Sequence, residues 1–143
     1  QMSEALSLFD FPPPASFVLL GGRFEAVDAE AGVLEPSFEA DPRFLNPGGV
    51  VQGGFLTAMV DDTMGPLVMA MTKAKKFPST TDIHTTFYAP AAPGGRLQVR
   101  ATADRIGGTI AYTSAEIRDK TGTLIARAIQ TARLLDFGKG SQG

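Results

Sequence analysis

The sequence contains no cysteine and no tryptophan, and its single histidine is His84. Without cysteine the chain can form no disulfide, no thiolate metal site and no cysteine nucleophile. Its apolar runs are short, because Asp61, Asp62 and Pro66 interrupt the longest of them. None reaches the roughly 20 apolar residues that a membrane-spanning helix needs. No basic segment followed by an apolar one marks the N-terminus, so we expect a cytoplasmic protein without a membrane partner.

Charge of either sign is also modest, with 13 basic and 15 acidic residues and a net charge of −2. A general nucleic-acid binder needs a basic surface to neutralise phosphates, so we expect no nucleic-acid partner. The 143 residues are 43% hydrophobic and 20% charged, which is the composition of one globular domain. We assign residues 1–14 to an N-terminal extension, residues 15–137 to a single domain and residues 138–143 to a flexible tail.

Hydrophobic periodicity predicts a mixed architecture in which strands dominate. An apolar stripe with 3.6-residue spacing predicts a helix from about Gly54 to Ala74, with a kink or break at Pro66. Alternating patterns between turn residues predict six strands, over residues 17–28, 33–40, 79–88, 96–106, 109–118 and 123–135. The last four should form a meander, and the short turns favour antiparallel pairing. The predicted fold class is α+β, with a curved antiparallel sheet packed on one long helix.

Such a layout leaves one face and one edge of the sheet uncovered. An open sheet edge can pair with a strand of another chain, and most oligomers are closed assemblies of identical chains. We therefore expect a homodimer, and we predict a homotetramer formed by two such dimers.

The segment 46–62 contains the residues that are best suited to catalysis. Gly53 and Gly54 open the predicted helix, where backbone N–H groups without intrahelical acceptors can hold a developing oxyanion. A plain loop leading into a glycine-rich helix start is the alternative. A helical projection puts Asp61 on the flank of the apolar stripe and Asp62 opposite the stripe in solvent. A carboxylate on the flank can be half-buried at a subunit contact, which shifts its pKa toward a useful value. Both carboxylates could equally be surface charges.

His84 is a weaker candidate for a catalytic residue. It lies on a predicted strand, on one face with Asp82, Thr86 and Tyr88. A surface or structural histidine explains it better than a catalytic one, since no nucleophile stands beside it in the sequence. The sequence also has no G-x-S-x-G motif, so nothing indicates a Ser-His-Asp hydrolase.

The segment around the helix start resembles that of the hot-dog-fold acyl-CoA thioesterases, in the PaaI-like and 4-hydroxybenzoyl-CoA thioesterase superfamily. Those proteins carry a polar residue, then His-Gly-Gly, then an acidic residue nine positions after the histidine. Four residues match in type and spacing: Asn46, Gly53, Gly54 and Asp61. The stretch 80–91 is similar to the strand that follows the helix in that family. Gln52 departs from the motif, because it stands where most members have histidine. Glutamine can donate and accept hydrogen bonds but cannot take up and release a proton in acid–base catalysis.

The resemblance implies a hot-dog fold, in which the sheet wraps around one long central helix, and hydrolysis of an aryl- or medium-chain acyl-CoA. Asp61 would act as nucleophile or general base, and the Gly53 N–H would polarise the thioester carbonyl. The other implied catalytic residues, which position water or the carbonyl, are Asn46 and Gln52. The implied substrate contacts are Gly54, Thr80 and Asp62.

The resemblance further implies a site shared between two subunits, with no metal and no redox cofactor. Coenzyme A would enter only as part of the small-molecule acyl-CoA substrate. Gly108 falls near a position where many members have a basic residue, so a contact to a CoA phosphate could be missing. Two alternatives stay open: an acyl-CoA-binding protein without turnover, marked by Gln52, or an enoyl-CoA hydratase or dehydratase. The position of His84 on a strand disfavours the second alternative.

Overall fold

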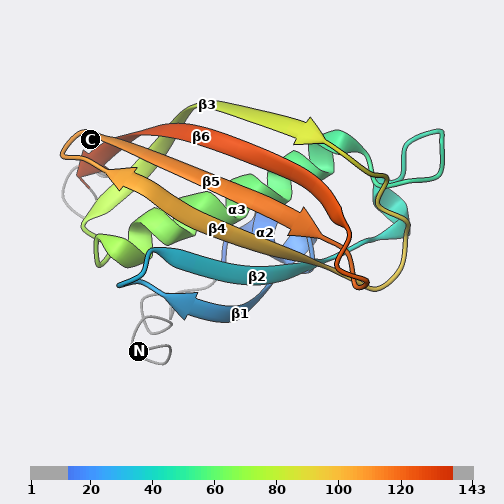
Figure 1. Cartoon of the computed structure of the whole chain (residues 1–143). Coiled ribbons are helices and arrows are strands. Elements are labelled where there is room, and N and C mark those ends of the chain that lie inside the picture. Colours follow the sequence, from blue (N-terminus) through green and yellow to red (C-terminus); the bar gives the residue numbers. More distant parts are fainter. Residues whose placement is uncertain (1–12, 137–143) are drawn as a thin grey trace.

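The order of helices and strands follows the predicted order, with one additional helical turn near the start. The computed structural model describes residues 13–136 (Figure 1). Its elements are α2 (Ala15–Leu19), β1 (Arg23–Asp28), β2 (Val33–Glu39), the 3₁₀ turn η2 (Pro42–Phe44), α3 (Gly53–Met71), β3 (Lys76–Phe87), β4 (Arg96–Ile106), β5 (Ile110–Arg118) and β6 (Leu124–Asp136). The predicted extension and tail lie outside the described residues, apart from Pro13 and Pro14.

The strands form one six-stranded antiparallel sheet in the order β1-β2-β4-β5-β6-β3. The sheet curves around α3, which lies along its inner face (Figure 1). This arrangement confirms the predicted α+β class with one long helix. The inner positions of β5 and β6 are mostly small, so the helix backbone can approach the sheet closely: Ala111, Ala115, Ala126, Ala128 and Ala132.

The predicted four-strand meander is wrong in one respect. β4, β5 and β6 are successive neighbours joined by short turns, but β3 pairs with β6 and not with β4. β2 already occupies the other edge of β4, with Leu34 opposite Ala101 and Phe38 opposite Leu97. The connection over residues 88–95 therefore runs from one edge of the sheet to its middle (Figure 1). As a result β3 becomes an edge strand.

The strand predicted over residues 17–28 is also wrong in its first part, because residues 15–19 form α2. Phe17 and Leu20 are buried whereas Val18 and Leu19 between them are exposed, which is a helical pattern of burial. Gly21 then ends the turn with a φ of +66°, which glycine adopts without strain. A Cβ at this position would also collide with the side chain of Glu39, so the chain approaches β2 closely here.

α3 buries the predicted apolar stripe against the sheet. Its buried side chains are Leu56, Met59, Val60, Thr63, Met64, Leu67, Val68 and Ala70. Pro66 lies inside the helix and does not end it, so the predicted break is absent. The helix ends three residues earlier than predicted, at Met71. Lys73 and Ala74 follow with φ values of 53° and 61°, which are incompatible with a continuing right-handed helix.

Candidate active site

One stripe of α3, from Gly53 to Gly65, faces the edge strand β3. The stripe consists of every fourth residue: Gly53, Thr57, Asp61 and Gly65. Their counterparts on β3 are Phe87, Thr85, Thr80 and Pro78. Residues four apart lie on one face of a helix, which is why these positions line up with a single strand. We call these eight residues the α3–β3 seam, and Asp61 is its only ionisable member.

The Asp61 carboxylate is held through one of its two oxygens. Oδ1 accepts a hydrogen bond of 2.6 Å from Gln130 Nε2 and one of 3.3 Å from Thr80 Oγ1. Oδ2 has no hydrogen-bond partner within residues 13–136, and the residue is exposed in the single chain. A carboxylate fixed at one oxygen and open at the other can attack an electrophile or take a proton from water.

Gln130, the strongest partner of Asp61, was not among the residues singled out from the sequence. It lies on β6 and is 2% exposed. A signal for it exists, because it interrupts a row of alternate apolar positions on the strand: Ala126, Ala128, Ala132 and Leu134. A glutamine on the buried face of an apolar strand needs a polar partner from the element packed against it. Here that element is α3.

The start of α3 brings together the predicted residues Gln52, Gly53 and Gly54. Gln52 is the N-cap residue, and its side chain makes no capping hydrogen bond. Its carbonyl accepts from the N–H groups of Phe55 and Leu56. The N–H groups of Gly53 and Gly54 bind no acceptor within the described part of the chain. These two donors, at the positive end of a 19-residue helix, can hold a carbonyl oxygen that gains negative charge.

Asn46 organises the loop that leads into α3. Its Oδ1 accepts hydrogen bonds from Gly48 N at 2.9 Å and Val50 N at 3.3 Å, and its own N–H bonds to the Val50 carbonyl. The side-chain oxygen is therefore engaged in the loop. The Nδ2 group keeps its donors, since nothing in residues 13–136 accepts from it.

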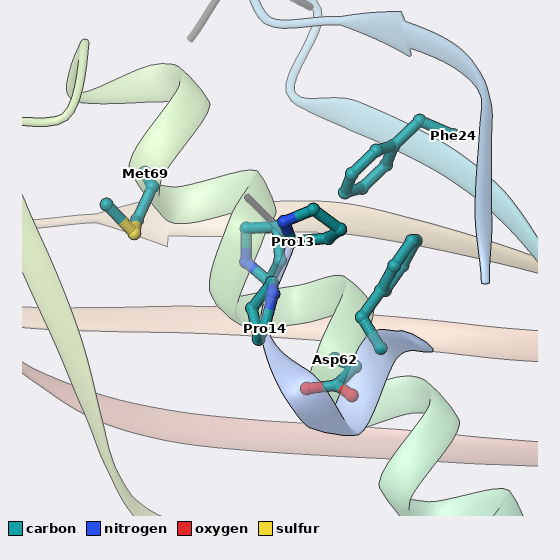
Figure 2. Close-up of a pocket in the computed structure, with 7 residues that line it drawn as sticks. Pro13, Pro14, Phe24, Asp62 and Met69 are labelled. Atoms are coloured by element: carbon teal, nitrogen blue, oxygen red, sulfur yellow. The ribbon is translucent and has the colours of Figure 1, made fainter. Parts of the chain in front are cut away.

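Asp62 does not lie in solvent, and that prediction is wrong. Its Oδ2 is buried without a hydrogen-bond partner among the described residues. The carboxyl lines a small apolar pocket of about 70 Å³. Figure 2 shows it among the other lining side chains. The other lining residues are Pro13, Pro14, Phe17, Phe24, Pro66 and Met69. Around Asp62, the side of α3 opposite the sheet is thus covered by α2 together with Pro13 and Pro14, which a projection of the helix alone does not include.

Burial raises the pKa of the Asp62 carboxyl above its ordinary value, because an apolar pocket disfavours the charged form. A hydrogen bond from the Ser16 side chain opposes this effect on the pKa, and the neighbouring carboxylate of Asp61 adds to it. Asp61 and Asp62 are adjacent in sequence, yet they face different surroundings. Only Asp61 lies in the α3–β3 seam.

We expect Asp62→Asn to raise the melting temperature at neutral pH. The raised pKa means that the folded state binds this proton more tightly than the unfolded state does. The protonated group therefore supports folding at low pH, and this contribution is lost as the pH rises from about 4 through the raised pKa. Asparagine stays neutral at every pH, so it avoids the buried charge that Asp62 acquires. Thermal melts across this range should show a gain that grows with pH, and a gain independent of pH would contradict the explanation.

His84 lies outside the seam. It pairs across the strands with Ile129, which is 61% exposed on the outer face of the sheet, and its Nε2 lies 3.5 Å from Thr86 Oγ1. The interpretation as a surface histidine agrees with this position. Within residues 13–136 no group of three or more His, Asp and Glu side chains is arranged to hold a metal ion. No helix of the described residues is long and apolar enough to span a membrane.

Comparison with known proteins shows the family to which this chain belongs. The model of the thioesterase superfamily matches residues 48–126. Human acyl-coenzyme A thioesterase 13 is 28% identical over 114 residues, which cover 79% of this chain and 81% of that protein. A crystal structure of a phenylacetic acid degradation-related protein from Ralstonia eutropha is 38% identical. It covers 90% of this chain and 97% of its own, with a TM-score of 0.84.

A further structure, the PaaI protein of the E. coli phenylacetic acid degradation operon, shares the fold at 16% identity. Its TM-score is 0.82, over 94% of this chain and 93% of its own. The curved sheet around α3 and the family match define a hot-dog-fold protein. The chain belongs to the thioesterase superfamily. It is a thioester hydrolase, as the resemblance of its helix start implied.

Proposed function

We propose that this chain hydrolyses acyl-CoA thioesters, with an aryl or medium-length acyl group, and that Asp61 is its nucleophile or general base. The observation that carries the proposal is the Asp61 carboxylate, which is held at Oδ1 and open at Oδ2 on the α3–β3 seam. The similarity to an acyl-coenzyme A thioesterase supports coenzyme A as the thiol part of the substrate.

In the proposed reaction the thioester carbonyl oxygen lies against the Gly53 N–H, which stabilises the negative charge that develops on it. Asp61 Oδ2 either attacks the carbonyl carbon or removes a proton from a water molecule that attacks it. In the first route the C–S bond breaks, the CoA thiolate leaves, and water then hydrolyses the mixed anhydride. Gln52 and Asn46 position the carbonyl or the water, and Thr80 helps hold the water beside Asp61.

The spacing of the two key groups argues that each site combines two chains. Asp61 follows Gly53 by eight residues, which is about 12 Å along a helix axis. One thioester carbonyl is far too small to reach both groups of the same helix. The amide of one chain and the carboxylate of another can meet it together. We therefore propose that the site is formed at a homodimer contact.

The edge strand β3 is the surface that we propose for this contact. It is 12 residues long, and within residues 13–136 it pairs only with β6. An open edge of this length presents unpaired backbone groups that a second copy of β3 can bind. Because α3 runs along β3, pairing at this edge would bring two seams close together. The homotetramer stays a prediction from the sequence.

Thiol release from a series of acyl-CoA substrates tests the proposed function. Aryl substrates such as benzoyl- and phenylacetyl-CoA should be compared with medium-chain substrates such as octanoyl-CoA. We expect turnover above the spontaneous rate with at least one of these groups. Tight binding without thiol release would identify a non-catalytic binding protein instead. Addition of water to an enoyl-CoA without thiol release would identify a hydratase.

A further inference from the structure

We infer that Gln130 is a positioning residue that fixes the Asp61 carboxylate for reaction. The inference rests on the proposed function of Asp61. It adds a residue from β6, a strand that contributes none of the predicted site residues. The contact joins positions 69 residues apart in the chain, and its 2.6 Å distance is at the short end for an N–H donor, as hydrogen bonds to charged acceptors are.

Gln130 is placed rigidly by the sheet. Its Cα lies opposite Ile83 on β3 and opposite Thr113 on β5, so ladders on both sides restrain its backbone. The side chain is 2% exposed and points from the inner face of the sheet toward α3. A donor held this firmly can define the orientation of the group that accepts from it.

The orientation of the Gln130 amide also points to a role beyond packing. An ionised carboxylate only accepts hydrogen bonds, so Nε2 must face Asp61 and Oε1 must face away. That Oε1 is buried and has no hydrogen-bond partner within residues 13–136. Burying an amide oxygen without a donor is unfavourable. An apolar side chain of similar size would avoid this disadvantage, so the glutamine is better explained by its effect on Asp61.

Both hydrogen bonds to Asp61 end on the same oxygen. With Gln130 in place, Oδ1 is anchored and Oδ2 becomes the reacting atom. Without it, the carboxylate keeps only the 3.3 Å contact with the exposed Thr80. The carboxylate would then rotate among several orientations, and only a fraction of them would place an oxygen for attack. Since the Gln130 side chain is buried and bonded to Asp61, its loss should lower kcat and leave KM unchanged.

The test compares Gln130→Met with Thr113→Val. Methionine keeps the approximate volume of glutamine and removes the donor, whereas Thr113→Val alters the buried polar neighbour on β5 without touching Asp61. For Gln130→Met we expect kcat to fall by about 10- to 100-fold with KM changed by less than about twofold. Thr113→Val should retain kcat. Equal losses in the two variants would show a general packing effect and overturn the inference.

The double variant Asp61→Asn/Gln130→Met tests whether Gln130 acts through Asp61. Once Asp61 is replaced, Gln130→Met should lower the remaining turnover by less than about twofold, since residues that act as a unit are not additive. A full additional loss would overturn the inference. If Gln130→Met does not fold, Gln130→Glu replaces the N–H donor by oxygen at nearly constant shape. It should lower kcat at least about tenfold with KM unchanged.

The two proposals can fail separately in these assays. If Asp61→Asn abolishes turnover while Gln130→Met retains a wild-type kcat, the positioning role is wrong and the proposed function stands. If Asp61→Asn itself retains turnover, the proposed role of Asp61 is wrong, and the positioning role is wrong with it.

Discussion

Asp61→Asn is expected to lower kcat/KM for acyl-CoA hydrolysis by about 10²- to 10⁴-fold, the usual range for the loss of a general base. Asparagine keeps the size of the side chain and an oxygen that can accept from Gln130 and Thr80. It can neither attack as a carboxylate nor take a proton from water. Steady-state thiol release with the best acyl-CoA substrate measures the effect, and a larger loss would favour the nucleophilic route.

Asp62→Asn is the matched control, because it makes the same chemical change one residue further along α3. Asp62 lies in the pocket beneath α2 and not in the α3–β3 seam. We expect it to lower kcat/KM by less than about threefold. An inactive Asp62→Asn beside an active Asp61→Asn would reverse the assignment of the two carboxylates. Full turnover in both variants would exclude the proposed mechanism.

Gly53→Pro is expected to lower kcat by about 10²- to 10³-fold, the range observed when one oxyanion donor is removed. Gly53 is the first residue of α3, a position where proline fits because its N–H has no intrahelical acceptor. Gln52 before it has φ −62° and ψ 140°, the extended conformation that a following proline requires. The substitution therefore deletes the donor and preserves the helix.

Gly53→Ala distinguishes the loss of the N–H donor from the steric effect of a larger side chain. A Cβ at this position would lie 2.9 Å from the tip of the Phe87 ring, so both variants force that half-exposed ring to move. Only the proline variant also removes the N–H. We expect Gly53→Ala to keep most of the kcat that Gly53→Pro loses. Equal losses in kcat would show that the Phe87 contact matters and that the amide does not.

A mixture of the Gly53→Pro and Asp61→Asn variants, each with little activity of its own, shows whether the site is shared. If each site combines Gly53 of one chain with Asp61 of the other, a mixed dimer of Gly53→Pro and Asp61→Asn has one intact site. Random association makes half of the dimers mixed, so co-refolding should restore about a quarter of the wild-type activity. If each chain contained a complete site, mixing would restore nothing. Light scattering of the same samples reports the assembly directly.

The local features of the chain could be predicted from its sequence because they depend on near neighbours. The alternation in β4 identifies that strand to the residue. The apolar stripe of α3 identifies the start of the helix to within one residue and its end to within three. The glycines at the helix start and the spacing from Gly53 to Asp61 are also local, since helical geometry fixes how residues eight positions apart are related. For this reason the sequence indicated both the fold class and the proposed helix-start donor.

Contacts between distant segments required the tertiary structure. The alternation in β3 shows that it is a strand but not which strand it joins, and only the packed sheet places it at the edge beside β6. The helical projection likewise considers the sheet side of α3 alone. It misses α2, whose packing buries Asp62, and it misses the approach of Gln130 to Asp61. The residues of the seam are set by helical periodicity, whereas the hydrogen bonds that orient its carboxylate arise only when β3, β6 and α3 pack together.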